Sequence, residues 1–445
     1  MSFLYNTLLE RFILPAGDIA LGTAYMKQLK DWRKIEKLSS DELQANQKNS
    51  LQKLLAHATE NVPFYKNLGI ESNDDVYKLI RDFPIMTKNV IKDNMDQLVI
   101  KDKNSLVKLS SSGSSGIQGE VYMEKKNQSM QLAVQTLWWE WSGYRLGNSL
   151  IQTGITPDRG KVKALKDKLL HTRYVSAYNL DKEEILNILK ESQKKPIDHF
   201  MGYASSLFVF ASIAREYGIN DIHFKSVVSW GDKMFPHFRT LIEKQFSTTV
   251  YDTYGCSEGF MIAGECEQHN YHIMMPMVYL ELLDNQGNEV APGEPGMVVV
   301  TRLDNYAMPL IRYYLGDIAV AEDPGKTCSC GRHFPLLKQV IGRDTDIIKT
   351  RSEKYMVVHA FTGIFEHITE IKQFRVIQKN LDGIEIEFIR DEGFGNQVLE
   401  LIKSQIDSYL KEDFPVIFIE VDQILPTPSG KPQIIQSFLK QSIAN

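Results

Sequence analysis

The stretch of sequence that decides the fold runs over residues 226–258 and reads SVVSWGDKMFPHFRTLIEKQFSTTVYDTYGCSE. It predicts a strand at 226–230, a helix that opens with a proline at 236–245, and a second strand at 248–254. A further helix is predicted at 205–217. This alternation of helix and strand is typical of an α/β fold with a mostly parallel sheet.

The regions on either side predict further structure. Residues 278–320 are expected to form antiparallel strands joined by turns that contain glycine and proline. Residues 105–110 and 120–124 predict two strands, and 127–144 predicts a long helix whose three tryptophans we expect in the core and at its rim. Residues 27–60 carry helical periodicity. The whole predicts a large N-terminal domain with mixed sheets.

The pattern changes after Gly342, where a compact α+β unit of about a hundred residues is predicted. Its expected elements are strands at 374–378, 384–389 and 416–421 and a helix at 396–411. We therefore expect a boundary near residue 343, which divides the chain into domains of 1–342 and 343–445.

The composition is that of an ordinary globular protein, with 43% hydrophobic and 24% charged residues in 445. A core of this size needs no disulfide. The 51 basic and 56 acidic residues give a net charge of −5, which argues against nucleic acid as a partner. The start lacks a basic signal segment and no run approaches ~20 apolar residues, so we expect a cytoplasmic protein without a transmembrane segment. A peripheral membrane contact through the apolar first thirty residues stays open.

Residues 110–116, which read SSSGSSG, form the densest motif in the chain. Glycines let backbone N–H groups converge on an anion and serine hydroxyls add donors, so the loop suits a polyphosphate. It lacks the Gly-Lys-Ser/Thr ending of a P-loop, and a strand follows it instead of a helix. A flexible linker is the alternative, but linkers seldom lie between two strands of one domain.

Four more motifs follow in order: YGCSE at 254–258, RYYLGD at 312–317, GRDTDIIK at 342–349 and PTPSGK at 426–431. Glu258 follows a predicted strand, where metal and nucleotide contacts occur in α/β sheets. Asp317 is expected after a strand and a glycine turn, which suits hydrogen bonding to a ribose diol. Lys431 is predicted on a rigid turn, and a solvated surface lysine is the alternative there.

Cysteine and histidine residues predict a structural Zn²⁺ site. The favoured ligands are Cys266, His272, Cys328 and Cys330, with His269 as the competing histidine. A set of three thiolates and one imidazole suits tetrahedral zinc, and it leaves no open position for catalysis. Four free thiols in a reduced cell are the alternative. The fourth cysteine of the chain, Cys256, lies inside the YGCSE motif and is expected to be a packing residue.

The order of these motifs resembles that of the adenylate-forming superfamily, which contains acyl-CoA synthetases, peptide-synthetase adenylation domains and luciferases. The resemblance spans almost the whole chain. Residues 54–65, 83–88 and 328–343 are most similar to the phenylacetate–CoA ligase branch, which includes proteins of capsular polysaccharide biosynthesis. The resemblance implies the fold of that superfamily, with a small β-barrel-like part in the large domain and a mobile C-terminal domain.

The resemblance also implies a role for each motif. The ATP phosphates would be held by Ser111, Ser112, Gly113, Ser114, Ser115 and Gly116. The adenine would lie along Trp230, Gly231, Asp232, Tyr254 and Gly255. Glu258 would bind Mg²⁺, Asp317 with Arg343 would bind the ribose, Thr345 would form the hinge, and Lys431 would act in adenylation.

The implied activity is ATP-dependent, AMP-forming activation of a small carboxylic acid, followed by transfer to CoA. The segment Thr350–Glu353 lacks the glycine that CoA ligases of the family carry beside the thiol tunnel. An amine is therefore a second candidate acceptor, for instance an amino sugar of a surface polysaccharide. An inactive nucleotide-binding scaffold is the third alternative. The identity of the acid and the oligomeric state, with a homodimer among the options, stay open.

Overall fold

The computed structural model describes the chain except for residues 1, 111–119, 155–159, 178–181, 344–346, 353–354, 358–360, 362–363, 366–367, 369, 392, 426–433 and 440–445. The predicted phosphate loop Ser111–Gly116, the hinge residue Thr345 and Lys431 therefore lie outside the described residues.

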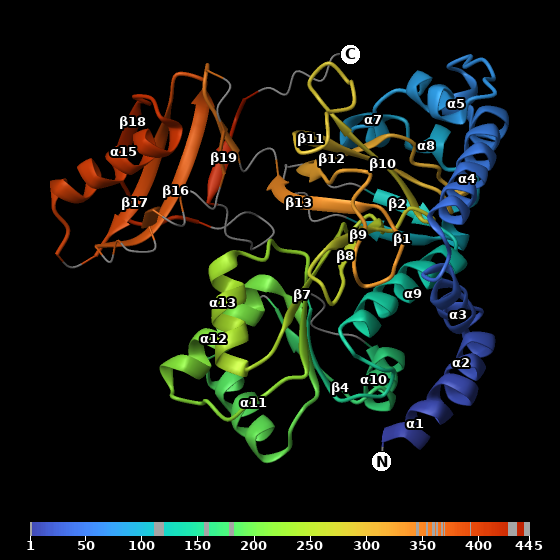
Figure 1. The fold of residues 1–445 in the computed structure, drawn as a ribbon, viewed down its shortest axis with the longest axis horizontal. Coiled ribbons are helices and arrows are strands. Elements are labelled where there is room, and N and C mark those ends of the chain that lie inside the picture. Colours follow the sequence, from blue (N-terminus) through green and yellow to red (C-terminus); the bar gives the residue numbers. More distant parts are fainter. Residues whose placement is uncertain are drawn as a thin grey trace.

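An eleven-stranded sheet dominates the large part of the molecule, in the order β10-β11-β12-β13-β9-β8-β7-β6-β5-β3-β4 (Figure 1). One half is parallel and consists of β3 (Leu150–Gly154), β4 (Thr172–Ser176), β5 (His199–Tyr203), β6 (Ser226–Trp230) and β7 (Val250–Gly255). The other half is antiparallel and consists of β8 (Met261–Glu265), β9 (Tyr271–Ile273), β10 (Val278–Leu283), β11 (Pro295–Arg302), β12 (Tyr313–Ala321) and β13 (Leu336–Arg343). The predicted α/β fold with mixed sheets is confirmed.

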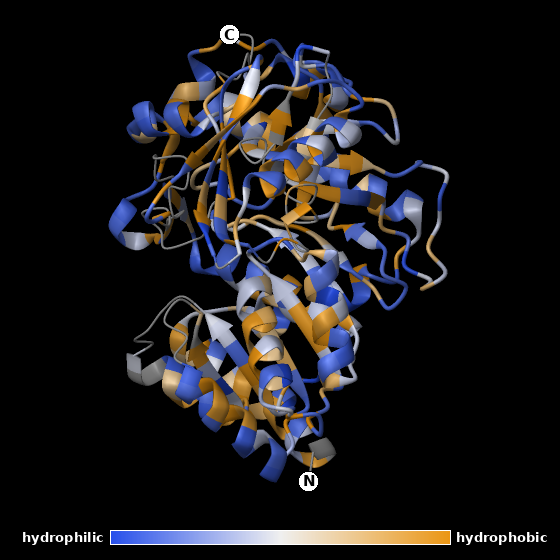
Figure 2. Ribbon diagram, turned by 90° about the vertical axis from the view of Figure 1, so that its left-hand side faces the viewer, coloured by the Kyte–Doolittle hydropathy of each residue, from blue (hydrophilic) through white to orange (hydrophobic). Residues whose placement is uncertain are grey.

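Helices accompany the parallel half of the sheet and share a core with it. They are α10 (Gly160–Leu169), α11 (Lys182–Lys194), α12 (Ala204–Glu216) and α13 (Pro236–Phe246). Phe200 of β5 packs against Phe210 of α12 and Phe246 of α13, and all three are fully buried. Figure 2 shows apolar residues gathered along these strands and helices. This core fixes the carboxyl ends of β5, β6 and β7 at one edge.

The N-terminal helices run along one side of the molecule (Figure 1). The longer elements are α1 (Ser2–Leu8), a π-helical turn at Leu9–Ile13, α2 (Leu14–Leu21), α3 (Tyr25–Ile35) and α4 (Ser40–Asn61). Short helices follow as α5 (Pro63–Lys66), α6 (Val76–Leu79), α7 (Lys88–Asp93) and α8 (Met95–Leu98), with 3₁₀ turns at Ile80–Asp82 and Lys103–Ser105. The predicted helical region 27–60 is two helices, because Ser39 and Glu42 form a capping box that starts α4.

A two-stranded hairpin precedes the long helix α9 (Lys125–Trp141), as predicted. Its strands are β1 (Val107–Ser110) and β2 (Glu120–Met123), which pair antiparallel. Trp138 and Trp141 of α9 are buried and Trp139 is half-buried, as expected for core and rim positions. No helix in the described part of the chain is long and apolar enough to cross a bilayer.

The C-terminal part has a sheet of its own in the order β18-β17-β16-β19. The strands are β16 (Ile371–Asn380), β17 (Gly383–Arg390), β18 (Val416–Glu420) and β19 (Ile435–Ser437), packed with α15 (Asn396–Leu410). β14 (Ile347–Lys349) and β15 (Tyr355–Val357) form a separate pair. Figure 1 shows this sheet to the side of the large one. Its core is a separate cluster of buried residues between Ile348 and Ile435.

Candidate functional site

The loop that leaves β6 lies where the carboxyl ends of the parallel strands meet. Trp230 ends β6 and stacks on Trp139 of α9, with ring centroids 5.8 Å apart. Gly231 follows with a φ of +75°, and a Cβ at this position would lie 2.4 Å from the ring of Tyr203. A side chain is therefore excluded here both by backbone conformation and by space. Such a flat, aromatic edge suits the face of a planar ring.

Asp232 and Lys233 fix this loop to its neighbours. The Asp232 carboxylate accepts hydrogen bonds from the hydroxyl of Ser205 and, at 3.4 Å, from its backbone N–H, in the first turn of α12. Lys233 donates to the carbonyl of Ile341 in β13. The segment predicted to lie along an adenine is thus tied to the strand that ends in Arg343.

Tyr254 and Asp317 come together from β7 and β12. The Tyr254 hydroxyl donates to Asp317 Oδ2 at 2.8 Å, and Asp317 pairs in register with Arg343 of β13. The sequence prediction that Asp317 follows a strand and a turn is wrong, because it lies within β12. Gly316, with a φ of +78°, forms a local irregularity in that strand, where the register between β11 and β12 shifts.

Glu258 lies in a buried polar cluster just after β7. The Tyr313 hydroxyl donates to Glu258 Oε1 at 3.0 Å, and Lys88 Nζ lies 3.8 Å from the same oxygen. Glu258 is 4% exposed, so its carboxylate lies in a site of low polarity, where the Tyr313 hydroxyl and the Lys88 ammonium stabilise its charge. Burial, and then the neighbouring Glu258 carboxylate, raise the pKa of Tyr313 well above its ordinary value, so its proton stays on the hydroxyl.

Sequence reasoning gave no role to Lys88 or Tyr313. A signal for Lys88 exists, since Thr87 caps α7 and places this lysine in the first turn of the helix. A cation at that end of a helix is disfavoured by the helix dipole, so a nearby anion is the physical reason to have one. The backbone of Met86 is held by Arg312 and Tyr314 at 2.8 and 3.0 Å, which fixes the segment.

The hairpin β1–β2 packs against the residue that follows Glu258. Gly259 has a φ of +92°, and a Cβ there would lie 2.9 Å from Leu109 and 3.0 Å from Met123. Those two residues belong to the strands that flank the predicted phosphate loop. The base of the hairpin and Glu258 are therefore neighbours, although the two motifs lie more than a hundred residues apart in sequence.

Three cysteines and one histidine form a second cluster. The ligand atoms of Cys266, His272, Cys328 and Cys330 all lie within 4.8 Å of one another. The Cys266 and Cys328 sulfurs are 3.6 Å apart, and Cys330 Sγ is 3.3 Å from His272 Nε2. Zinc bonds of 2.0–2.3 Å in a tetrahedron put neighbouring ligands about 3.3–3.8 Å apart. The donor set and its spacing therefore fit zinc.

The surroundings of Cys328 and His272 suit metal ligation, whereas burial raises the pKa of the other two thiols, Cys266 and Cys330. Burial raises the pKa of the Cys328 thiol, but hydrogen bonds from Cys330, Cys266 and Asn270 outweigh this effect and lower it overall. Burial, with the charge of Arg332, lowers the pKa of His272 to about 4 and keeps its imidazole neutral. Metal ligands of these kinds are thiolates and neutral imidazoles.

Two residues considered at the sequence level lie outside this cluster. His269, the competing histidine, has its Nδ1 3.6 Å from a carboxylate oxygen of Glu265. Cys256 lies in the loop with Glu258, and its backbone N–H donates to Phe260 O. Burial, and then the Glu258 charge, raise the pKa of Cys256, so the thiol is protonated.

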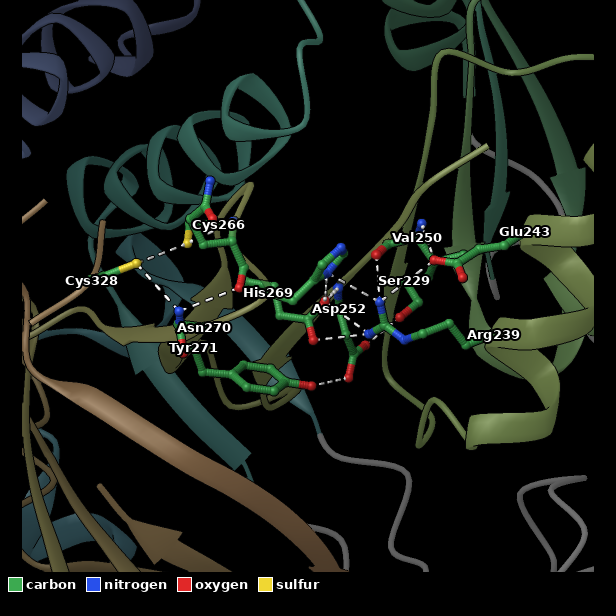
Figure 3. Close-up of polar contacts among 12 residues, drawn as sticks. Ser229, Arg239, Glu243, Val250, Asp252, Cys266, His269, Asn270, Tyr271 and Cys328 are labelled. Carbon is green, nitrogen blue, oxygen red and sulfur yellow. Dashed lines mark hydrogen bonds and ion pairs between the residues drawn. The ribbon is translucent and has the colours of Figure 1, made fainter. Parts of the chain in front are cut away.

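A buried polar network links the parallel and antiparallel halves of the sheet (Figure 3). Asp252 accepts hydrogen bonds from the hydroxyls of Ser229 and Tyr271, the latter at 2.5 Å. Its backbone N–H donates to Glu265 at 2.8 Å, and Arg239 donates to both oxygens of that Glu265. Burial and the Glu265 charge raise the pKa of Asp252 to about 6.

This network lies between the two clusters described above. Two of its members are next to metal-site residues in sequence, as the pairs Glu265–Cys266 and Tyr271–His272. On the other side, Ser229 precedes Trp230, and Asp252 precedes Tyr254 by two positions on β7. Sequence reasoning missed the network because its members come from five separate elements.

Comparison with known proteins agrees with the motif order. A family model described as the CapK C-terminal domain matches residues 348–437. Protein CapK of Staphylococcus aureus is 23% identical over 95% of each chain. A phenylacetate–coenzyme A ligase of Pseudomonas putida is 25% identical over 84% of this chain and 90% of its own. The solved structure of a 2-hydroxyisobutyryl-CoA ligase with a bound adenylate superposes with a TM-score of 0.69 at 18% identity, over 90% of this chain and 91% of that one. The fold of the chain is that of the adenylate-forming, AMP-forming ligases, and its sequence is similar over most of its length to CapK and to the phenylacetate–coenzyme A ligases.

Proposed function

We propose that this protein activates a small carboxylic acid with ATP, forming an acyl-adenylate and pyrophosphate. The observation that carries the proposal is the convergence of Tyr254, Asp317 and Glu258 at the carboxyl end of β7. Asp317 suits the ribose hydroxyls, with Arg343 opposite it in β13, and Glu258 suits a divalent cation on the phosphates. These are the roles that the resemblance of the sequence to the adenylate-forming superfamily implies for the same motifs.

For this reaction the protein must position the carboxylate and the α-phosphate and neutralise the charge on the phosphates. The substrate carboxylate attacks the α-phosphorus in line, and the bond to the pyrophosphate oxygen breaks. Bound Mg²⁺ would neutralise charge on the phosphates. We propose that Ser111–Gly116 hold those phosphates, that Trp230–Asp232 lie along the adenine, and that Lys431 offsets the charge developing in the transition state. Lys88 adds a cation beside Glu258.

The domain division is part of the same proposal. One arrangement of residues 343–445 would bring Lys431 to the α-phosphate, and another would admit the acceptor, with rotation near Thr345. The separate cores of the two parts support independent movement. We propose CoA as the acceptor, because its thiolate can attack the acyl-adenylate and release AMP. We propose the cytoplasm as the location.

Pyrophosphate release with a panel of carboxylic acids tests this function. At least one acid is expected to support release, and Lys431→Ala is expected to lower the rate about 10²–10³-fold. Lys379→Ala is the matched control, because Lys379 is a surface residue of the C-terminal sheet and pairs with Glu385. No release with any acid, or an equal loss in both variants, would contradict the proposal.

The acceptor is tested with the acid that passes this first assay. Thioester formation with consumption of CoA is expected. If AMP accumulates only when an amine is supplied, the acceptor is an amine, as the sequence of Thr350–Glu353 left open.

We further propose a structural Zn²⁺ on Cys266, His272, Cys328 and Cys330, because the four donor atoms fit a closed tetrahedral site. Protein purified without a histidine tag is expected to carry about one zinc per chain by elemental analysis. Cys328→Ser is expected to lose it and Cys256→Ser to keep it. Less than half an equivalent in the unmodified protein, or equal zinc in both variants, would contradict the site.

A further inference from the structure

The N-terminal helices expose an apolar stripe. Leu4, Leu8, Phe12 and Ile19 are 81%, 47%, 65% and 85% exposed, and we call these four residues the N-terminal stripe. The first three are spaced by four, so they lie on one helix face. Large apolar side chains that gather on one exposed face mark an interaction surface, whereas single ones do not.

The opposite side of the same helices is firmly attached to the protein. Leu9 is fully buried, and the Tyr5 hydroxyl donates to the carbonyl of Leu169 at 2.8 Å while its ring stacks on His171. Asp18 accepts the N–H groups at the start of α3, and Glu10 pairs with Arg33 at 2.9 Å. The stripe is therefore a fixed surface whose acidic neighbours are already engaged on the protein side.

The rim of the stripe is basic. Helix α10, which lies beside α1 in Figure 1, exposes Lys163, Lys166 and Lys168 together with Leu165. Its attachment to α1 is direct, since Leu169 accepts the hydrogen bond described above. At the other end, Lys125 Nζ lies 3.4 Å from the carbonyl of Leu21.

We propose that the N-terminal stripe and α10 dock this enzyme on the surface of an anionic lipid bilayer. Aliphatic and aromatic side chains in one plane with lysines at the rim are what an interfacial helix presents to acyl chains and charged headgroups. The helices lie along the interface and do not cross it, in keeping with the lack of a spanning helix in the described chain.

A second copy of the chain is a poorer occupant of this face. A two-fold dimer would place the same patch on both sides, so the lysines of α10 would approach those of the partner. Like charges that face each other across an interface oppose association, whereas anionic headgroups neutralise them.

Vesicle sedimentation tests the proposal with the full chain, purified without an N-terminal tag. The protein is expected to pellet with phosphatidylcholine vesicles that contain phosphatidylglycerol, to bind pure phosphatidylcholine at least about 10-fold more weakly, and to be released by about 0.5 M salt. Replacing Leu8, Phe12 and Ile19 by serine together is expected to weaken binding at least about 10-fold. Replacing Lys163, Lys166 and Lys168 by glutamate tests the basic rim in the same way.

The matched control is serine at Leu401, Tyr409 and Ile417, which are exposed apolar residues of the C-terminal part. This variant is expected to bind vesicles like the unmodified protein. Failure to pellet with anionic vesicles, or an equal loss in the control, overturns the proposal. So does a self-associated protein that the stripe variant turns into a monomer without any vesicle binding. Circular dichroism confirms that each variant is folded, and pyrophosphate release plays no part in the readout.

Discussion

At the scale of single residues, His199 shows how burial sets a charge state. Its side chain is 1% exposed, its Nδ1 lies 2.8 Å from the Ser226 hydroxyl, and the described chain offers its Nε2 no hydrogen-bond partner. Burial lowers the pKa of His199 to about 4. Protonation would leave a positively charged imidazolium in the core between β5 and β6, so the folded state disfavours the protonated form.

His199 predicts that stability falls in mild acid. The unfolded imidazole takes a proton below a pKa of about 6.5, but the folded one does so only near 4. Between these values the unfolded state binds more protons, so this residue should lower the free energy of unfolding by about 2 kcal/mol between about pH 7 and about pH 5. Urea unfolding at both pH values measures the difference.

The His199→Asn variant is the control for that measurement. Asparagine does not titrate in this range, so its stability should depend less steeply on pH even if it is less stable at every pH. An equal slope for variant and unmodified protein would contradict the assignment.

Individual residues also show how far the candidate site is readable from sequence. The grouping of Cys266, His272, Cys328 and Cys330 was predictable because cysteine and histidine have few roles in a protein without disulfides. His272, and not His269, lies with the three cysteines. Its position in β9 brings it next to Cys330, whereas His269 lies next to Glu265. The role of Lys88 depends on a contact across 170 positions, which no local pattern encodes.

At the scale of elements, strong periodicity gave good predictions. The strand at 226–230 is β6 with the same bounds, and α13 ends one residue later than predicted. Strands β3 and β4 and helix α10 were not predicted, and the sequence of α10 is rich in lysine. Pro15 lies in the first turn of α2, a position at which proline is tolerated.

The polar network predicts that a hydrogen bond between β9 and β7 contributes to the stability of the folded protein. Tyr271→Phe removes the hydroxyl that donates to Asp252, so a buried carboxylate loses one donor. The free energy of unfolding should fall by about 1–3 kcal/mol, measured by chemical denaturation. The control is Tyr251→Phe in β7, a half-buried tyrosine whose raised pKa comes from burial and nearby charges and from no hydrogen bond within the described part of the chain. If the two substitutions lowered the free energy of unfolding equally, the loss of the Tyr271 hydrogen bond would not be the cause.

At the scale of the whole molecule, the buried residues form separate clusters. Those of the large sheet and its helices end at Leu337, whereas the C-terminal cluster spans Ile348 to Ile435. The change of pattern after Gly342 predicts a domain boundary near residue 343, which stays a prediction. The position of one part relative to the other was beyond sequence reasoning, since few local signals report on contacts between folded units.

The separate cores predict that residues 1–343 fold without the remainder. This fragment should unfold cooperatively in a thermal melt and bind the proposed zinc, because all four candidate ligands lie within it. It should release no pyrophosphate, because the proposed Lys431 is absent. A fragment without a cooperative transition would contradict independent folding, and a fragment with full activity would contradict the role of Lys431.

The pairing of β9 with β13 has a consequence for how the chain is made. Leu336 and Leu337 pair with His272 and Tyr271, and the intervening β10, β11 and β12 form local hairpins. The ribosome must therefore deliver roughly three quarters of the 445 residues before this seam can close. Until then β9 is an unpaired edge on a nascent chain, which is where a chaperone would bind and where self-association would begin. The cysteines at 328 and 330 leave the exit tunnel just ahead of β13, so zinc capture would fasten this seam as it forms.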